Sequence, residues 1–164
     1  MEKRIGRLIS VLYRKSQMFI GQALKSSDVT SAEYPILIAL YRKNGITQEE
    51  LSAYLYLDKS AVARVIQALV TKGFVTKNKD ENDQRCNRIY LTEKGYGIQP
   101  QIEKALNDWN AILMMGFGKE KEEKIYEQLL HMVANVKEEF IDKSVTDNDL
   151  TKRQEIKDGR ECKG

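Results

Sequence analysis

The residues best suited to chemistry in this sequence lie at positions 58–75, DKSAVARVIQALVTKGFV. Apolar side chains recur there at the i, i+3, i+4, i+7 spacing of a buried helical stripe, at Val62, Val65, Ile66 and Leu69. At about 100° per residue the opposite face carries hydrogen-bonding groups, on Ser60, Arg64, Gln67 and Thr71. A helix with one packed face and one face of short polar groups plus an arginine is suited to reading the major groove of DNA.

The charges of this stretch favour the same interpretation. Between positions 59 and 79 every charged side chain is positive, namely Lys59, Arg64, Lys72, Lys77 and Lys79. Such a run of cations without an acid can form a phosphate-binding edge. The alternative is an ordinary amphipathic helix with a solvated outer face, and the helix taken alone favours that alternative.

Local signals place this helix second in a pair. Asp58 supplies an N-cap oxygen at its start, and Gly73 stands where a left-handed C-cap is expected. Upstream, Thr47–Glu50 is a capping box that opens a short helix, after a brief strand at Ile46. Two short helices joined by so brief a turn predict a helix-turn-helix with the second helix in the reading position.

The segment before this pair predicts a supporting helix. Thr30–Glu33 is another capping box, and helical spacing then places four side chains inward: Tyr34, Leu37, Ile38 and Tyr41. Pro35 lies one residue beyond the favoured first-turn positions. We therefore expect it to remove one backbone hydrogen bond or to tilt that turn.

A β-hairpin is predicted directly after the reading helix. Two β-prone runs, 74–77 and 88–91, are separated by the polar, turn-rich loop KDENDQRCN. A hairpin in this place is a wing. In its loop, Asp83 lies two residues before Arg85 and can hold the guanidinium by a bidentate hydrogen bond while the arginine reaches into a minor groove. The alternative is a solvated acidic turn.

Long helices are predicted toward both ends of the chain. Apolar residues recur at helical spacing over 4–25, and again from a cap at Thr92 to a break at Gly116 and Gly118. A last helix covers about 119–141. Because these helices flank the winged unit in sequence, their stripes can pack together and provide a dimer interface.

The predicted fold is therefore mainly α with a small β-hairpin. It consists of a winged helix-turn-helix DNA-binding lobe at 30–95, flanked by long dimerisation helices at 4–25 and 96–141. Residues 142–164 alternate acids and bases, so we expect a polar C-terminal extension there, helical in part or mobile.

Composition excludes several classes of protein. The sequence has 164 residues, of which 41% are hydrophobic and 31% charged. This composition is typical of neither a disordered protein nor a membrane protein. No apolar run approaches the roughly 18 residues of a membrane span, and the N-terminus has charges inside its apolar pattern. We therefore expect a cytoplasmic protein. The net charge of +3 is too small to indicate nucleic acid by itself.

Side chains for catalysis or metal binding are sparse. Cys86 and Cys162 form no CxxC pair and His131 is the single histidine, which argues against a structural zinc site and a disulfide framework. Without a phosphate-binding glycine loop or a nucleophile partner for the histidine, we expect no enzyme, no cofactor and no metal. A redox role stays open for Cys86, which lies between Arg85 and Arg88 in a segment expected to be exposed.

From position 45 to 95 the sequence closely resembles the winged helix-turn-helix core of the MarR (multiple antibiotic resistance regulator) family. The preceding SAEYPILIAL is similar to the second helix of that family, and the likeness covers about residues 4–141. The specific parts are the start and end of the reading helix, the wing tip and the end of the hairpin: Asp58-Lys59-Ser60, Lys72-Gly73, Asp83-x-Arg85 and Leu91-Thr92-Glu93-Lys94-Gly95.

The resemblance implies a homodimer with intertwined termini on a pseudo-palindromic operator. Each recognition helix would occupy a major groove, through Lys59, Ser60, Ala61 and Arg64, and each wing a flanking minor groove, through Asp83 and Arg85. With the polar face of the helix and the cations of the hairpin, the full set of DNA-contact candidates is Lys59, Ser60, Ala61, Arg64, Gln67, Lys77, Lys79, Asp83, Arg85 and Arg88.

The resemblance also implies a small-molecule site. Family members commonly respond to small, often aromatic, ligands in a cleft between the reading lobe and the dimer helices. The candidates from the first two helices are Tyr13, Phe19, Tyr34, Ile38 and Tyr41, with plain core packing as the alternative for most of them. One branch senses organic peroxides through a cysteine in the first helix, and this first helix has none.

The sequence thus predicts a dimeric, sequence-specific regulator of transcription that binds double-stranded DNA, more often a repressor than an activator. The alternative is a winged-helix protein-interaction module with little DNA affinity. The run of cations from Lys59 to Lys79 argues against that alternative.

Overall fold

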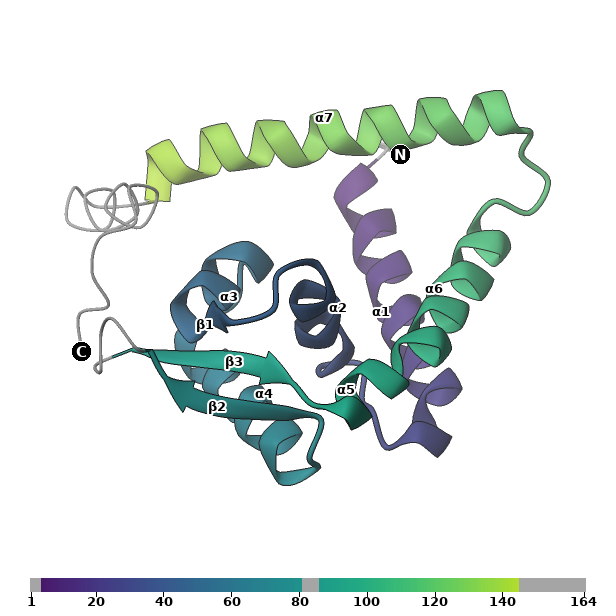
Figure 1. Cartoon of the computed structure of the whole chain (residues 1–164). Coiled ribbons are helices and arrows are strands. Elements are labelled where there is room, and N and C mark those ends of the chain that lie inside the picture. The colour runs from purple at the N-terminus through teal and green to yellow at the C-terminus, as the bar shows by residue number, and fades with distance from the viewer. Residues whose placement is uncertain (1–3, 81–85, 145–164) are drawn as a thin grey trace. The chain divides into compact units, whose positions relative to one another are not determined.

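The computed structural model describes residues 4–80 and 86–144, with side chains described as far as residue 136. The chain divides into two compact units, between Asn110 and Ala111. The first unit holds, in order, α1 (Ile5–Ala23), a short 3-10 helix η1 (Lys25–Ser27), α2 (Tyr34–Arg42), β1 (Ile46–Thr47), α3 (Gln48–Leu55), α4 (Lys59–Thr71), β2 (Val75–Lys79), β3 (Asn87–Leu91), α5 (Glu93–Gly97) and most of α6 (Gln99–Leu113) (Figure 1). The second unit holds the end of α6 and α7 (Lys119–Ser144).

The three strands form one antiparallel sheet in the order β1-β3-β2. The predicted hairpin is confirmed as β2 and β3, which pair from Val75 and Leu91 at one end to Lys79 and Asn87 at the other. The brief strand expected at Ile46 is also confirmed, and it pairs with the free edge of β3. The wing is therefore attached to the helix-turn-helix by a third strand, which protects an edge that would otherwise be open.

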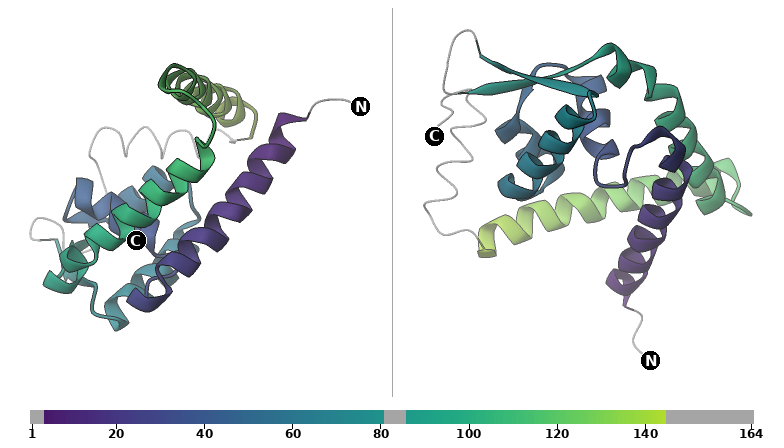
Figure 2. Two further views of the ribbon diagram at one scale, coloured as in Figure 1. Left: turned by 90° about the vertical axis from the view of Figure 1, so that its right-hand side faces the viewer. Right: turned by 90° about the horizontal axis from the view of Figure 1, so that it is seen from below.

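A single core joins the sheet to the helices of the first unit. Its largest fully buried side chains come from every part of that unit, namely Ile20, Leu24, Ile36, Leu37, Leu40, Leu51, Ile66, Leu69, Phe74, Ile89 and Ile102. Helices α1 and α6 run side by side (Figures 1 and 2), and the ring centroids of Phe19 and Trp109 are 5.5 Å apart. Helices α1 and α6 thus pack together and complete the core of the first unit.

Local capping signals were predicted with mixed success. The box at Thr47–Glu50 is confirmed, with both of its reciprocal hydrogen bonds present. At Thr30–Glu33 the Glu33 carboxylate accepts from the Thr30 amide at 2.8 Å, but the helix begins only at Tyr34. The position predicted for Pro35, beyond the favoured first-turn sites, is therefore wrong, because this residue stands at the start of α2, where its missing N–H costs little.

The single long helix predicted from Thr92 is also wrong in one respect. Thr92 does cap a helix, accepting from the Gly95 amide, but this helix ends at Gly97 and α6 starts anew at Gln99. Pro100 explains the break, since a proline inside a continuous helix lacks a donor and clashes with the carbonyl four residues earlier. Gly116 lies in the following turn with a φ of 84°, as its predicted role as a helix breaker requires.

Helix α7 confirms the last predicted helix and extends it to Ser144. Its first turn is acidic, and Lys124 contacts Glu120 at 2.6 Å across one turn. Large apolar side chains along its described part are exposed, at Tyr126, Leu129, Leu130, Val133 and Val136. Among the residues that the structure describes, no helix combines the length and apolar character needed to cross a membrane.

Candidate nucleic-acid interface

The predicted reading helix is α4, and its ends form as the sequence indicates. The Asp58 carboxylate accepts from the amides of Ser60 and Ala61, at 2.8 and 3.2 Å. These hydrogen bonds, together with one from the Ser60 hydroxyl, lower the pKa of Asp58. After the helix, Gly73 takes a φ of 75°, which a residue with a side chain rarely adopts. The cap fixes where the helix begins, and therefore which side chains can meet a groove first.

The two faces of α4 are confirmed. Val62, Ile66 and Leu69 are buried in the core, and Val65 is half-buried beside them. The four polar side chains of the other face are all exposed, at Ser60, Arg64, Gln67 and Thr71. Two hydroxyl donors on this face already have partners, because Ser60 donates to Asp58 and Thr71 donates to the Gln67 carbonyl. The Arg64 guanidinium and the Gln67 amide are therefore the outward groups best able to make new hydrogen bonds.

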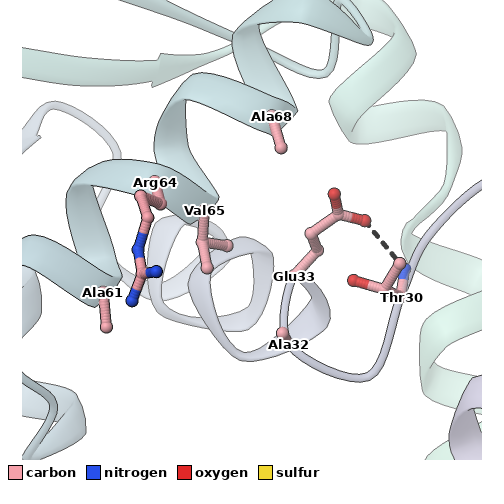
Figure 3. Close-up of a pocket in the computed structure, with 7 residues that line it drawn as sticks. All are labelled: Thr30, Ala32, Glu33, Ala61, Arg64, Val65 and Ala68. Carbon is pink, nitrogen blue, oxygen red and sulfur yellow. Dashed lines mark hydrogen bonds between the residues drawn. The ribbon is translucent and has the colours of Figure 1, made fainter.

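Arg64 stands at the rim of a hollow between α4 and the start of α2. The hollow has a volume of about 330 Å³ and is lined by Thr30, Ala32, Glu33, Ala61, Arg64, Val65 and Ala68. Figure 3 shows the guanidinium beside Ala61, across the hollow from the Glu33 carboxylate. Small side chains on α4 thus leave room beside an extended arginine, and the Ala61 methyl is accessible there.

The cations do not form one uniform phosphate-binding edge. Lys59, the first residue of α4, is paired with Glu49 of α3. Lys72 contacts the carboxylates of Asp28 at 3.3 Å and Glu33 at 3.0 Å. Burial alone would lower the pKa of Lys72, but its hydrogen bonds to these two acids outweigh that effect and raise it. The run of five cations contains no acid in the sequence. In the folded chain, however, acids from other segments pair with two of these cations, so the edge is not free of acids.

The buried acid in this arrangement is Glu33, whose side chain is 5% exposed. It accepts from both the Thr30 amide and the Lys72 ammonium, so its charge is compensated where water is scarce. Lys72 also donates to the Asp28 carbonyl at 2.9 Å. Through these contacts the end of α4 is fastened to the segment before α2, and Lys72 acts inside the lobe.

Arg88 has a similar structural place in the wing. Its guanidinium pairs with the buried carboxylate of Asp80 and donates to the Gly45 carbonyl at 2.8 Å. These contacts join the far end of the hairpin to the segment before β1. The sequence placed Arg88 among the DNA-contact candidates, but in the structure both of these groups already engage its guanidinium.

Lys77 and Lys79 differ from the other cations of this surface. Both are exposed on β2 and, two residues apart, they lie on one face of the strand. Among the described residues, neither has an acid within salt-bridge distance. The predicted tip residues Asp83 and Arg85 lie outside the described residues. Cys86, expected to be exposed, is in fact buried, with 6% of its surface exposed.

The five ligand candidates differ in their exposure. Tyr13 is 63% exposed, whereas Phe19, Tyr34, Ile38 and Tyr41 are partly buried and pack against the core. Burial raises the pKa of Tyr34, with a smaller contribution from nearby Tyr13.

Tyr41 has a defined structural role. Its hydroxyl donates to the Gly95 carbonyl at 2.7 Å, and burial raises its pKa to about 12. Most of the candidates thus follow the alternative of core packing, and the hollow beside α4 includes none of them.

The acids that pair with the cations were missed by sequence reasoning. Glu49, Glu33 and Asp80 lie 10, 39 and 8 residues from their partners. Glu33 closes the predicted box at Thr30–Glu33, which explained its presence without reference to Lys72, whereas Glu49 lies within the span of the second box but takes no part in its hydrogen bonds. Only the packing of α3, α4 and the wing brings these charges together.

Comparison with known proteins places this geometry in a family. The model of the MarR family matches residues 29–87. An uncharacterized HTH-type transcriptional regulator of Bacillus subtilis, YybA, is 30% identical over 129 residues, which cover 79% of this chain and 85% of that protein. The multiple antibiotic resistance protein MarR of Escherichia coli is 32% identical over 100 residues, 61% of this chain and 69% of that protein.

Solved structures agree. A MarR transcriptional regulator from Methanosarcina mazei has a TM-score of 0.77 and 41% identity, covering 80% of this chain and 94% of that one. A mutant MarR of Escherichia coli, crystallised in complex with operator DNA, has a TM-score of 0.71 and 28% identity, over 79% of this chain and 92% of that one. With its capped reading helix and three-stranded wing, the chain belongs to the MarR family of winged helix-turn-helix, DNA-binding transcriptional regulators, which are not enzymes.

Proposed function

We propose that this protein is a homodimeric repressor that binds a pseudo-palindromic operator through α4 and the wing, and that a small, often aromatic, effector releases it. The observation that carries the proposal is the outer face of α4, which is exposed along its length while the inner face is buried in the lobe. The complex of the Escherichia coli relative with operator DNA supports DNA as the binding partner.

We assign base reading to the exposed face of α4. Arg64 can donate two hydrogen bonds to a guanine edge, and Gln67 can pair with adenine in the same groove. The Ala61 methyl provides an apolar contact of the kind that a thymine methyl accepts. Ser60, held by Asp58, contributes its hydroxyl oxygen near the start of the helix.

We assign contacts with the DNA backbone to the wing and to the start of α4. Lys77 and Lys79 present exposed ammonium groups on β2, and Lys59 lies at the N-terminus of the reading helix. We assign Arg85 to the minor groove, with Asp83 as its expected partner, on the basis of the sequence and the family resemblance alone. Arg88 is better assigned to holding the wing in place, because Asp80 and Gly45 already engage its guanidinium.

Dimerisation is supported by apolar side chains that the chain leaves exposed. On α1 they are Ile5, Leu8, Ile9 and Leu12, which follow helical spacing, and on α7 they are Tyr126, Leu129, Leu130, Val133 and Val136. Exposed apolar stripes of this extent are typical of surfaces that another chain covers. A second copy of the chain would also place two reading helices on one duplex, as a pseudo-palindrome requires.

The effector site is assigned to the first two helices. Tyr13 is exposed on α1, and it lies near enough to Tyr34 to add to the rise in the pKa of Tyr34 that burial causes, so these two side chains are the best remaining candidates for contact with an aromatic ligand. Phe19, Ile38 and Tyr41 are better explained by packing.

Selection of bound fragments from random DNA at two salt concentrations tests the function directly. A dimer should return inverted repeats whose half-sites lie about one helical turn apart. Affinity should fall steeply with salt, with a log–log slope of about −0.9 for each phosphate neutralised. A salt titration that stays flat and recovers no motif would favour the protein-interaction module instead.

Substitution of Arg64 tests the reading face. Arg64→Ala should cost roughly 1 to 3 kcal/mol of operator affinity and relax base preference at one position of each half-site. Lys104→Ala, which removes an exposed cation from α6, is the control and should bind like the parent. If Arg64→Ala gives the parental footprint, Arg64 does not read bases.

A further inference from the structure

Glu49 is an acid beside the start of the proposed reading helix. It belongs to the first turn of α3, and its carboxylate pairs with the ammonium of Lys59, the first residue of α4. The Lys59 side chain is 67% exposed and that of Glu49 is 23% exposed. The pair therefore lies at the surface, beside the N-terminal residues of the proposed reading helix.

The helix cap does not require this acid. In α3 the capping box is complete with Thr47 and Glu50, and Glu50 has its own lysine partner, Lys43 at 2.7 Å. Glu49 contributes only the modest, screened attraction of an acid for a helix N-terminus. Its specific contact is the one with Lys59, so its removal should leave the fold intact.

The pair changes how Lys59 can meet a phosphate. Nonspecific DNA binding is almost wholly electrostatic and grows with each phosphate that a lysine neutralises. While Lys59 is paired with Glu49, the two charges cancel, and the carboxylate itself repels an approaching phosphate. Hydrogen bonds between α4 and the bases depend much less on this charge. An acid here thus weakens binding to any duplex more than it weakens the reading of the operator.

Other cations of the surface provide a contrast. Lys77 and Lys79 have no acid within salt-bridge distance among the residues described. Arg88 and Lys72 are paired with buried acids and belong to the scaffold. Among the DNA-contact candidates that the structure describes, Lys59 is paired with an acid that is partly exposed and that takes no part in the capping box of α3.

We propose that Glu49 competes with DNA phosphate for Lys59 and so restrains nonspecific DNA affinity, which raises the ratio of operator binding to background binding. This inference rests on the proposed function, because it requires α4 to face DNA. It makes Glu49 a residue that sets specificity without touching a base.

The test is a double-mutant cycle of Glu49→Gln and Lys59→Gln, measured by fluorescence anisotropy on a selected operator and on an unrelated duplex over a series of salt concentrations. Glu49→Gln should bind the unrelated duplex about 3- to 10-fold more tightly and steepen its log–log salt slope by up to about 0.9, the value for one added phosphate contact. The gain on the operator should be smaller. In the Lys59→Gln background, Glu49→Gln should have no more effect than the loss of any one surface acid.

Asp108→Asn measures that general effect, because Asp108 is an exposed acid on α6 paired with Lys104. Glu49→Ala is the second variant and should change affinity in the same direction as Glu49→Gln. Unchanged or weaker binding by both Glu49 variants, or an equal gain with Lys59 absent, overturns the inference. A parent protein that binds neither duplex overturns the proposed function instead, and the two failures are thereby distinguished.

Discussion

The central lobe and the helices near the two chain ends use the same apolar pattern with opposite results. In α4 the stripe of Val62, Ile66 and Leu69 is fully buried. In α1, an equally regular stripe leaves Leu8 65% and Leu12 47% exposed, and α7 resembles α1 in this respect. The stripe of α4 is buried within its own chain, whereas these side chains of α1 and α7 stay exposed. Periodicity therefore indicates that a helix has an apolar face, but not whether its own chain covers that face.

The largest expected effect comes from adding charge to the exposed stripe of α1. The double variant Leu8→Glu/Leu12→Glu should give a monomer, because carboxylates at the centre of an apolar interface lose their hydration. Operator affinity should then fall roughly 100-fold or more, since two linked half-site contacts become independent. Sedimentation velocity and anisotropy measure the two effects. Arg14→Glu makes the same charge change on the opposite side of α1 and should stay dimeric; if both variants stay dimeric, α1 is not the interface.

The next largest effect should arise inside the lobe, at Gly95. A Cβ atom there would lie 2.2 Å from the backbone oxygen of Phe74, which cannot move without breaking the end of the hairpin. Gly95→Ala should reduce the free energy of unfolding by about 3 kcal/mol, the upper range of overpacking effects. Urea denaturation measures the loss. The control is Gly97→Ala in the same short helix, where nothing lies within 4 Å and little change is expected.

Removal of a cap should have a smaller effect on the lobe. Thr47→Ala removes the side chain that accepts from the Glu50 amide and should cost about 1 kcal/mol of stability. Thr71→Ala is a matched control, because Thr71 is exposed and bonds only to a carbonyl within its own helix. Thermal melts of the two variants should therefore differ. Equal melting temperatures would mean that α3 is held by packing and does not depend on its cap.

The smallest effect is expected at Tyr41. Tyr41→Phe loses the hydrogen bond to the Gly95 carbonyl and should cost about 0.5 to 1 kcal/mol at neutral pH. Since the pKa of Tyr41 is raised from 10.0 to about 12 in the folded lobe, its contribution is fully present below pH 10 and is lost as the pH rises through 12. Denaturation of parent and variant at several alkaline pH values should show their stabilities converging. Parallel curves would contradict the assignment.

The amino-acid sequence by itself determined the features that depend on near neighbours. The cap of Asp58, the box of Thr47–Glu50 and the positive φ of Gly73 are all settled within three or four residues. The two faces of α4 follow from helical spacing in the same way. For this reason the helix-turn-helix, the hairpin and the reading face could be predicted, and the family resemblance rested on the same short motifs.

Only the tertiary structure decided which cationic side chains are paired with acids from other elements. Lys59, Lys72 and Arg88 look equivalent to Lys77 and Lys79 in the sequence, yet the first three meet acids brought to them by the fold. An ion pair forms wherever packing leaves two side chains within reach, and that distance is set by the whole lobe. The sequence therefore determined the elements and the proposed reading face, and the structure decided which of these cations are paired with acids from other elements.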